Sequence, residues 1–488
     1  MPVDLLRRDM NTEGITGERL LYHLSFDLYF SRIFRDSAKR AYFLDVISSP
    51  LTSRDAILTR QTILRDLISH PGLLSAMTSL SGQFDAIRTN WSEYRSSKYR
   101  DKGGAKKSPT AAAQEQCSVS AITLGRLLYY IRDLKEVLEK YRPGSNVFRE
   151  LLSEVRRVTS GESFDRLITV CGELEHRTRW EPIDMRVTLD ALGRIRSAEL
   201  ISHKYIFVTD RDIRQRRSWL KRQASEVYPC EHISPTQEET DELLPVPFHE
   251  LANVIDDVVK QIFERYSGMS RELAFYEAAV AYVAFLTEKS VPFTFPDFTD
   301  DGAVSVDELY DTGLLAEMGT PAEIVPHTFR AMSGSIVVYG DNGSGKTSFL
   351  RSLTTAQLLA QAGLPVPAKT ARLRIYNAII SQFAEAEKEF EAGNDAGRFE
   401  QEVREISGLI DRAAPNSLAV LNETFQTTAY DEGAEGLYHI LRYFGRKRIS
   451  YIIATHMSQL RDRLDGEAMF IHVKNDHELE HGSPSGSA

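Results

Sequence analysis

The sequence predicts a multidomain protein in which a mostly α-helical region is followed by an α/β domain. Before residue 300, apolar residues recur at helical spacings of three and four, and prolines and glycines divide these stretches. Beyond Pro292, short β-branched runs alternate with helical stretches, a pattern typical of a parallel sheet. We therefore expect domains at residues 1–300 and 301–476, and a flexible tail at 477–488.

The composition narrows the class of protein. The length of 488 residues corresponds to about three domains. Hydrophobic residues make up 42% of the chain, which is the apolar content of a folded protein. The net charge of −10 excludes a protein that is basic overall, so a nucleic-acid surface has to be a local patch. Three scattered cysteines (Cys117, Cys171 and Cys230), no apolar leader after Met1 and no apolar stretch of about 20 residues favour a soluble cytoplasmic protein.

In the helical region, four segments have a clear apolar periodicity. They span residues 55–69, 127–138, 251–266 and 273–286. Thr52 or Ser53 provides an N-cap for the first, and Pro71 with Gly72 ends it. Helices of this number and spacing predict an extended helical core ahead of the α/β domain.

The strongest motif of the sequence follows a short β-branched run at residues 335–339. It has the pattern GxxxxGKT and leads into a helical stretch. Its residues are Gly340, Asp341, Asn342, Gly343, Ser344, Gly345, Lys346, Thr347 and Ser348. Glycines there let consecutive backbone N–H groups cradle phosphates, the lysine adds positive charge, and the threonine offers a hydroxyl to Mg²⁺. The motif predicts binding of ATP with Mg²⁺.

Hydrolysis would also need a carboxylate to polarise water and a sensor for the γ phosphate. The apolar run 417–421 ends in Asn422 and Glu423, at the sheet edge where open α/β sheets bind ligands. We expect Glu423 to be the general base, with Asn422 at the position of the usual magnesium-associated aspartate. A third run, 450–454, places His456 at the same edge. A strand-end carboxylate or a structural histidine is the alternative interpretation of either residue alone.

The order of these motifs resembles the ATPase domain of the MutS family, the DNA mismatch-repair clamps within the ABC-type ATPases. The segment 417–433 is similar to the family's Walker B strand with its Thr/Ser-rich turn, and Ile453–Leu460 is similar to its ATH switch. Upstream, Ser49–Thr52 with Arg60 and Gln61 resembles the opening of the family's core and lever region, and Phe275–Leu286 resembles its last core helix. His327 lies where the family often has an asparagine near the adenine.

The resemblance implies an ATP site completed across a dimer. Gly397 and Arg398 then occupy the signature segment that reaches the partner's γ phosphate, although Gly397 replaces a serine. Thr427 and Thr428 are expected near the same interface. Because few residues precede Pro50, we expect a short MutS-like branch without the family's mismatch-reading domain. The short segment after 473 suggests that a helical dimerisation segment is absent, so we expect weak dimers that depend on nucleotide rather than permanent ones.

Two stretches stand out against the acidic average. Residues 88–107 and 204–222 each contain seven Lys or Arg against two acids, interleaved with aromatic residues. Cations of this kind contact phosphate backbones, and flat rings stack on bases. A solvated helix face with tryptophan as a core anchor is the alternative for each. The candidate DNA contacts are Arg214, Arg216, Arg217, Lys221 and Arg222 first, then Lys98, Arg100, Lys106 and Lys107.

Together these features support one main hypothesis and one alternative. The main hypothesis is a dimeric MutS-like ATPase whose ATP-driven arm movements act on duplex or branched DNA. We expect its hydrolysis to be slow because Asn422 is uncharged. The alternative is an ATP-switched scaffold that binds a protein partner with little or no hydrolysis.

Overall fold

The computed structural model describes most of the chain in two compact units. It describes residues 3–6, 15–16, 19–100, 109–175, 184–189, 195–202, 245–318, 320–332, 334–383, 395–425, 430–464 and 466–481. One unit, here called the helical unit, comprises Met1–Val3, Ala76–Arg142 and Glu150–Ser270. The other, called the sheet unit, comprises Asp4–Ser75, Pro143–Arg149 and Arg271–Ala488. The two units are therefore interleaved along the chain.

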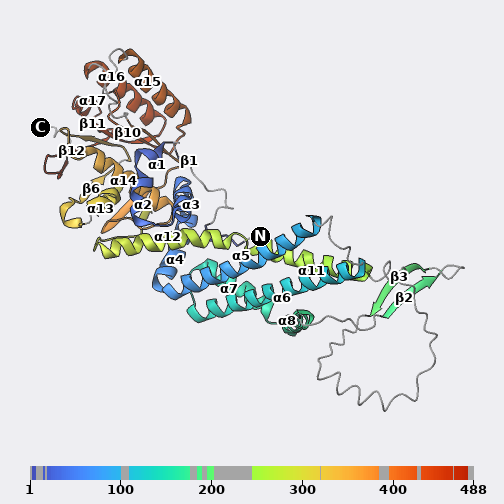
Figure 1. Cartoon of the computed structure of the whole chain (residues 1–488). Coiled ribbons are helices and arrows are strands. Elements are labelled where there is room, and N and C mark those ends of the chain that lie inside the picture. The colour runs from blue at the N-terminus through green and yellow to red at the C-terminus, as the bar shows by residue number, and fades with distance from the viewer. Residues whose placement is uncertain are drawn as a thin grey trace, which may run out of the picture. The chain divides into compact units, whose positions relative to one another are not determined.

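Long helices build the helical unit (Figure 1). They are the greater part of α5 (Pro71–Arg100), α6 (Pro109–Tyr141), most of α7 (Asn146–Thr159), α8 (Glu162–Glu175) and α11 (Pro245–Tyr266). A hairpin of β2 (Asp184–Leu189) and β3 (Ile195–Ser202), which was not predicted from the sequence, also belongs to it. Aromatic side chains fill the space between α5, α6 and α11, where Phe84 contacts Tyr130 and Phe263. Burial of these aromatic side chains stabilises the helices, which have polar outer faces and would be only marginally stable as isolated helices in water.

A seven-stranded sheet organises the sheet unit, in the order β1-β9-β10-β11-β7-β12-β13. Its strands are β1 (Ile15–Thr16), β7 (Ile336–Tyr339), β9 (Ala378–Phe383), β10 (Ser417–Asn422), β11 (Ser450–Thr455), β12 (Met469–Val473) and β13 (Leu479–His481). All pairs are parallel except β12 with β13. Residues 417–422 and 450–455 are buried throughout, as expected for strands covered on both faces. The predicted α/β domain with a parallel sheet is confirmed.

Helices pack on this sheet, and a smaller sheet accompanies it. The helices of the sheet unit include α12 (Met269–Glu288), most of which lies in this unit, α13 (Thr312–Met318), α14 (Lys346–Gln361), α15 (Asp395–Arg412), α16 (Tyr430–Arg446) and α17 (Leu460–Arg463), with a 3-10 turn at Pro321–Glu323. The smaller sheet has the order β4-β8-β5-β6, with β4 (Asp297–Thr299), β8 (Thr370–Arg374), β5 (Val304–Leu309) and β6 (His327–Ala331). The large sheet carries the site described below.

The beginning of the chain is part of the sheet unit. The elements α1 (Leu20–His23), α2 (Phe26–Ile33) and α3 (Ser37–Ser48), blue in Figure 1, lie among the orange and red elements of the carboxyl half. They are followed by α4 (Arg54–Ser69). β1 extends the edge of the large sheet by pairing Ile15 with Ala378. The buried guanidinium of Arg60 donates through Nε to the carbonyl oxygen of Leu6 (2.7 Å) and through Nη1 to that of Ala362 (3.3 Å).

A buried amide joins the same early residues to the end of α14. The side-chain nitrogen of Gln361 donates to the carbonyl oxygens of Leu51 and Tyr376, both at 2.8 Å. Its side-chain oxygen accepts from the Tyr376 backbone N–H (3.1 Å) and from Gln357 (2.7 Å). The Leu51 N–H in turn donates to the Gln361 carbonyl oxygen (2.9 Å). Such pairing offsets the cost of burying these backbone groups.

Most predicted helices and strands match the structure closely, with three differences. The helix at 55–69 is α4, capped by Ser53, but Pro71 also begins α5 directly, since proline is well suited to the first turn of a helix. The helix at 127–138 begins much earlier, at Pro109. Residues 477–481, expected in a flexible tail, complete a hairpin with β12 instead, because Leu479 pairs with Val473. Among the described residues, no helix combines the length and the apolar composition needed to cross a bilayer.

Candidate functional site

The GxxxxGKT motif forms the turn between β7 and α14. Its three glycines all have positive φ angles, namely +153° at Gly340, +81° at Gly343 and +103° at Gly345. A Cβ atom at Gly340 would lie 2.4 Å from the carbonyl oxygen of Val473, so only glycine fits there. The turn ends at Lys346, the first residue of α14. The backbone N–H groups of the turn therefore lie beside the N-terminus of this helix, whose dipole favours a bound anion. Strand, turn and helix are as the sequence predicts.

The ammonium group of Lys346 lies inside this turn. It donates to the carbonyl oxygens of Gly340 (2.9 Å) and Asp341 (2.8 Å). Burial lowers the pKa of Lys346, while Glu423 and Asp341 act in the opposite direction. Two neutral carbonyl groups compensate a buried cation only in part, so an anion entering the turn would gain the attraction of this ammonium.

The hydroxyl of Thr347 contacts the neighbouring strand β10. Its Oγ1 donates to Oδ1 of Asn422 at 3.2 Å. Asn422 is the last residue of β10 and is 8% exposed. The two oxygens are hard ligands of the kind that Mg²⁺ prefers, although both are uncharged. Among the described residues no cluster of three or more His, Cys, Asp or Glu side chains could hold a metal, so an ion here would depend on phosphate and water oxygens for its remaining ligands.

Glu423 and His456 follow two adjacent strands. Asn422 pairs with Ala454 across β10 and β11, and Thr455 pairs with Tyr339 across β11 and β7. Glu423 therefore comes next to the end of β11, and His456 comes next to the beginning of the glycine turn. Glu423 has φ of +55°, and its backbone N–H donates to the carbonyl oxygen of Ala454 (2.9 Å). Lys346, Thr347, Asn422, Glu423 and His456 thus gather at the carboxyl edge of one parallel sheet.

The hairpin between β12 and β13 lies against the glycine turn, a contact that was not predicted from the sequence. His477 donates from Nδ1 to the carbonyl oxygen of Ser344 (2.7 Å), and Asn475 donates to the Asp341 carboxylate (3.4 Å). The polar run Asn475-Asp476-His477 after the apolar strand 469–473 signals a turn. Its place beside the glycine turn depends on β12 pairing with β7, which sequence spacing does not reveal.

His327 is buried close to this hairpin, on β6. Its ring contacts Phe349 of α14 edge-on, with 5.1 Å between ring centres. Burial, with a smaller contribution from His477, lowers the pKa of His327 to about 4. The imidazole is consequently neutral near pH 7. Whether it contacts a base, as the resemblance implies, stays a prediction.

The remaining predicted site residues lie partly outside the described residues. Gly397 and Arg398 are in the first turn of α15, but their side chains are not described. The structure likewise does not describe Thr427, Thr428, Arg214, Arg216, Arg217, Lys221 or Arg222, nor Lys106 and Lys107, nor the side chains of Lys98 and Arg100. Their roles stay predictions.

In the other basic stretch, Trp91 and Arg95 have local partners. The Trp91 ring contacts Phe263 (5.3 Å between centres), and Arg95 lies over Trp91 and pairs with the buried Asp256 (3.2 Å). These contacts hold both half-buried residues within the helical unit. Whether the stretch 88–107 also binds nucleic acid stays a prediction.

The site has the features that bound ATP and Mg²⁺ require. The Ser344 hydroxyl is buried and has no hydrogen-bond partner among the described residues. A Cβ atom at Gly345 would crowd Nδ1 of His477 at 3.1 Å, so glycine keeps the turn open to a ligand. Together with the Lys346 ammonium and the Thr347–Asn422 pair, these groups fit a phosphate chain and a magnesium ion.

A glycine turn between a parallel strand and a helix, with an acidic residue at the end of a neighbouring strand, is the architecture of the phosphate-binding-loop proteins. Comparison with known families specifies the class further. Residues 336–480 match the model of MutS domain V, and residues 52–289 match the model of the MutS2 N-terminal domain. The two matches do not overlap and between them cover most of the sequence. The chain belongs to the MutS family.

Individual relatives are similar over shorter stretches. The DNA mismatch repair protein MutS of Acetivibrio thermocellus is 25% identical over 232 residues, which cover 46% of this chain and 26% of that protein. MutS of Petrotoga mobilis is 33% identical over 126 residues, covering 26% and 15%. A mitochondrial DNA mismatch repair protein mutS homolog of Sarcophyton glaucum is 27% identical over 160 residues, covering 33% and 16%. The matched part thus spans about a quarter or less of these relatives.

Proposed function

We propose that this chain is a MutS-like ATPase that binds ATP with Mg²⁺ at Gly340–Ser348 and hydrolyses it slowly. The observation that carries the proposal is the contact between Thr347 and Asn422 beside the buried Lys346 ammonium. It brings a hydroxyl, an amide oxygen and a cation together at the end of the strand that leads to Glu423. Family membership supports the same chemistry.

Each residue has a defined part in this reaction. Lys346 exchanges its two carbonyl partners for phosphate oxygens, and the turn's N–H groups hold the remaining phosphate charge. Magnesium, when bound, would neutralise phosphate charge, with Thr347 and Asn422 as its protein ligands. Glu423 accepts a proton from the attacking water. His456, at the end of the adjacent strand, senses the γ phosphate.

We further propose that the nucleotide state controls a dimer that acts on DNA. The start of α15, at Gly397 and Arg398, would approach the partner's nucleotide, and Thr427 and Thr428 would lie near that interface. DNA would be bound through phosphate contacts, with Arg214, Arg216, Arg217, Lys221 and Arg222 as candidates. Names of relatives that refer to DNA mismatch repair support this reading.

Two substitutions test the catalytic assignment. Glu423→Gln should keep the affinity for ATP and abolish turnover, because the amide cannot accept the proton from water. Lys346→Ala should lose binding, because the turn then lacks its cation. Binding is measured with a fluorescent ATP analogue, and turnover by phosphate release. A Glu423→Gln protein that hydrolyses ATP as fast as the wild type would show that Glu423 is not the base.

An ATP-switched scaffold with little or no hydrolysis is the second candidate. Asn422 favours it, because an uncharged ligand organises magnesium less strongly than the usual aspartate. Asn422→Asp should raise the hydrolysis rate and lower the Mg²⁺ concentration at half-maximal rate by roughly tenfold, as one added charge near the metal predicts. An unchanged rate, combined with ATP-dependent binding of a protein partner, would favour the scaffold.

A further inference from the structure

The residues that follow β10 adopt a conformation that their types rarely take. Both Glu423 (φ +55°) and Phe425 (φ +63°) have left-handed backbones although neither is glycine. Such conformations persist only where the surroundings hold them, and they concentrate at functional sites. The turn 423–425 therefore needs anchors, and these anchors determine where the Glu423 carboxylate points.

Three neighbouring elements provide those anchors. From β11, the carbonyl oxygen of Ala454 accepts from the Glu423 N–H (2.9 Å). From β9, the Gln382 side-chain oxygen accepts from the Thr424 hydroxyl (2.7 Å). From α15, a carboxylate oxygen of Glu402 accepts from the Phe425 N–H (3.1 Å). Thr424 and Phe425 are both buried, at 1% and 5% exposure, so an unpaired polar group here would find no water.

The α15 anchor differs from the other two because it is charged and belongs to a helix. Apolar packing strengthens the link, since the Phe425 side chain belongs to the same buried cluster as Ile406 and Leu409 of α15. The residues of the proposed interface segment, Gly397 and Arg398, begin the same helix. A movement of α15 would accordingly shift the turn 423–425 through the Glu402 carboxylate and through the apolar packing of Phe425.

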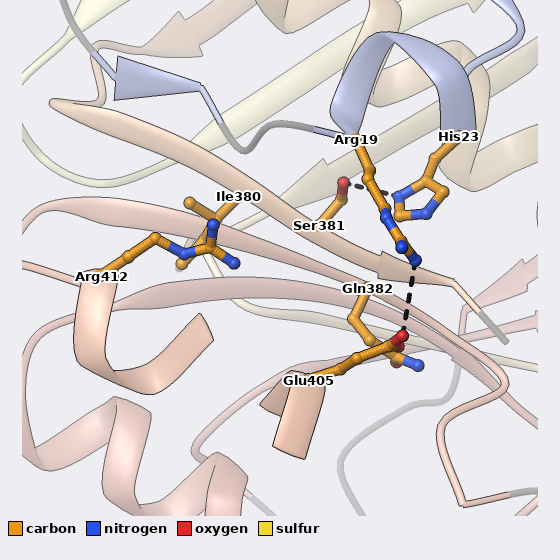
Figure 2. Close-up of a pocket in the computed structure, with 7 residues that line it drawn as sticks. All are labelled: Arg19, His23, Ile380, Ser381, Gln382, Glu405 and Arg412. Carbon is orange, nitrogen blue, oxygen red and sulfur yellow. Dashed lines mark hydrogen bonds and ion pairs between the residues drawn. The ribbon is translucent and has the colours of Figure 1, made fainter. Parts of the chain in front are cut away.

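One turn farther along α15, a second glutamate faces a different environment. Figure 2 shows Glu405 at a cavity of about 130 Å³ between α15, β9 and the beginning of the chain, where it pairs with Arg19 (3.5 Å). Gln382 also lines this cavity. Because Glu405 pairs with Arg19 instead of the Phe425 N–H, it is a matched comparison for Glu402 on the same helix.

We propose that Glu402 is a positioning residue, which fixes the turn 423–425 so that Glu423 can act as base and which transmits the state of α15 to that turn. The inference rests on the proposed function, because it assigns the base to Glu423. Its consequence is that contact between two subunits at the start of α15 would adjust the chemical step through Glu402, without Glu402 touching nucleotide.

Single-turnover hydrolysis and ATP affinity test this role. Glu402→Ala removes the acceptor and should slow hydrolysis about thirtyfold, the equivalent of one hydrogen bond to a charged group, with ATP affinity unchanged. Glu402→Gln keeps an acceptor oxygen and should stay within about fivefold of the wild type. The matched variant Glu405→Gln should hydrolyse at the wild-type rate. Hydrolysis per subunit should rise with protein concentration in the wild type and stay flat in Glu402→Ala.

The outcomes separate the inference from the proposed function. If Glu423→Gln abolishes hydrolysis but Glu402→Ala hydrolyses and responds to concentration like the wild type, only the role of Glu402 is refuted. Equal losses in Glu402→Ala and Glu405→Gln would also overturn it. If Glu402→Ala does not fold, Glu402→Met, which keeps the length of the side chain and removes the acceptor oxygens, decides the same question: it should slow hydrolysis and lose the dependence on protein concentration. A wild type without hydrolysis would refute both proposals, because no chemical step would exist to be positioned.

Discussion

At the scale of single residues, His327 links pH to stability. An unfolded histidine has a pKa of 6.5, and burial lowers this value to about 4 in the folded protein. The unfolded state therefore binds the proton more readily, so the stability that the neutral imidazole provides is present above pH 6.5 and is lost as the pH falls toward 4. Between about pH 7.5 and about pH 5, we expect this residue to account for a loss of about 2 kcal/mol in the free energy of unfolding.

Urea unfolding of the His327→Gln variant at the two pH values measures this contribution. The variant lacks the titrating ring, so its stability should fall by about 2 kcal/mol less than that of the wild type over the same interval. His439→Gln, which changes a histidine whose side chain is 70% exposed, is the matched control. Identical pH dependence of the wild type and His327→Gln would mean that the imidazole is not held neutral.

The sequence predicted some residues of the site and not others, for a physical reason. Lys346, Thr347, Asn422 and Glu423 follow from local motifs at strand ends, and the structure places them together. His477, Gln382 and Glu402 carry no such motif. Their positions depend on which strands are neighbours and on which face of α15 is buried, and these are properties of tertiary packing.

At the scale of elements, α14 is held at both ends. Its beginning forms the glycine turn, and its end is joined through Gln361 to Leu51 and Tyr376. Gln361→Met keeps the volume and leaves those backbone groups without their partner. We expect the free energy of unfolding to fall by about 3–5 kcal/mol, measured by urea denaturation. Gln459→Met, at an exposed residue bonded to Asp431, should change it by no more than about 0.5 kcal/mol. Comparable losses in the two variants would contradict the role of Gln361.

Element types were predictable where hydrophobic patterns are strong. The strands at 417–422 and 450–455 match their predictions because burial on both faces selects mostly apolar residues. The helix after Lys346 follows from the GxxxxGKT motif that precedes it. The early start of α6 was missed because residues 109–120 contain few large apolar side chains. β1 could not be foreseen, since two residues carry no periodicity and their partner lies more than 350 positions later.

At the scale of the whole molecule, the proposed action on DNA makes a prediction about salt. Reversing Arg216 and Arg217 to Glu should weaken binding to every DNA sequence and reduce the slope of log affinity against log salt by about 2, because each arginine would release about one counterion. Basal ATP hydrolysis should not change. Reversing Arg446 and Lys447, two exposed cations at the end of α16, is the control. Fluorescence anisotropy over a salt series measures both; an absence of DNA binding at low salt with ATP would favour the protein scaffold.

The interleaving of the two units also governs the order in which this protein can fold as it is synthesised. Residues 4–75 leave the ribosome before their partners in β9, α12 and α14, which follow roughly 200 or more residues later, about 10–40 s at ordinary rates of translation. By the time β9 and α14 are synthesised, residues 76–270, which include nearly all of the helical unit, have already left the ribosome. Leu6, Leu51 and Ile57, which are fully buried in the finished protein, are thus apolar surface on the nascent chain. This makes residues 4–75 the segment that chaperones should meet, and a sheet unit expressed from residue 301 onward would lack both the edge strand β1 and the Leu51 partner of Gln361.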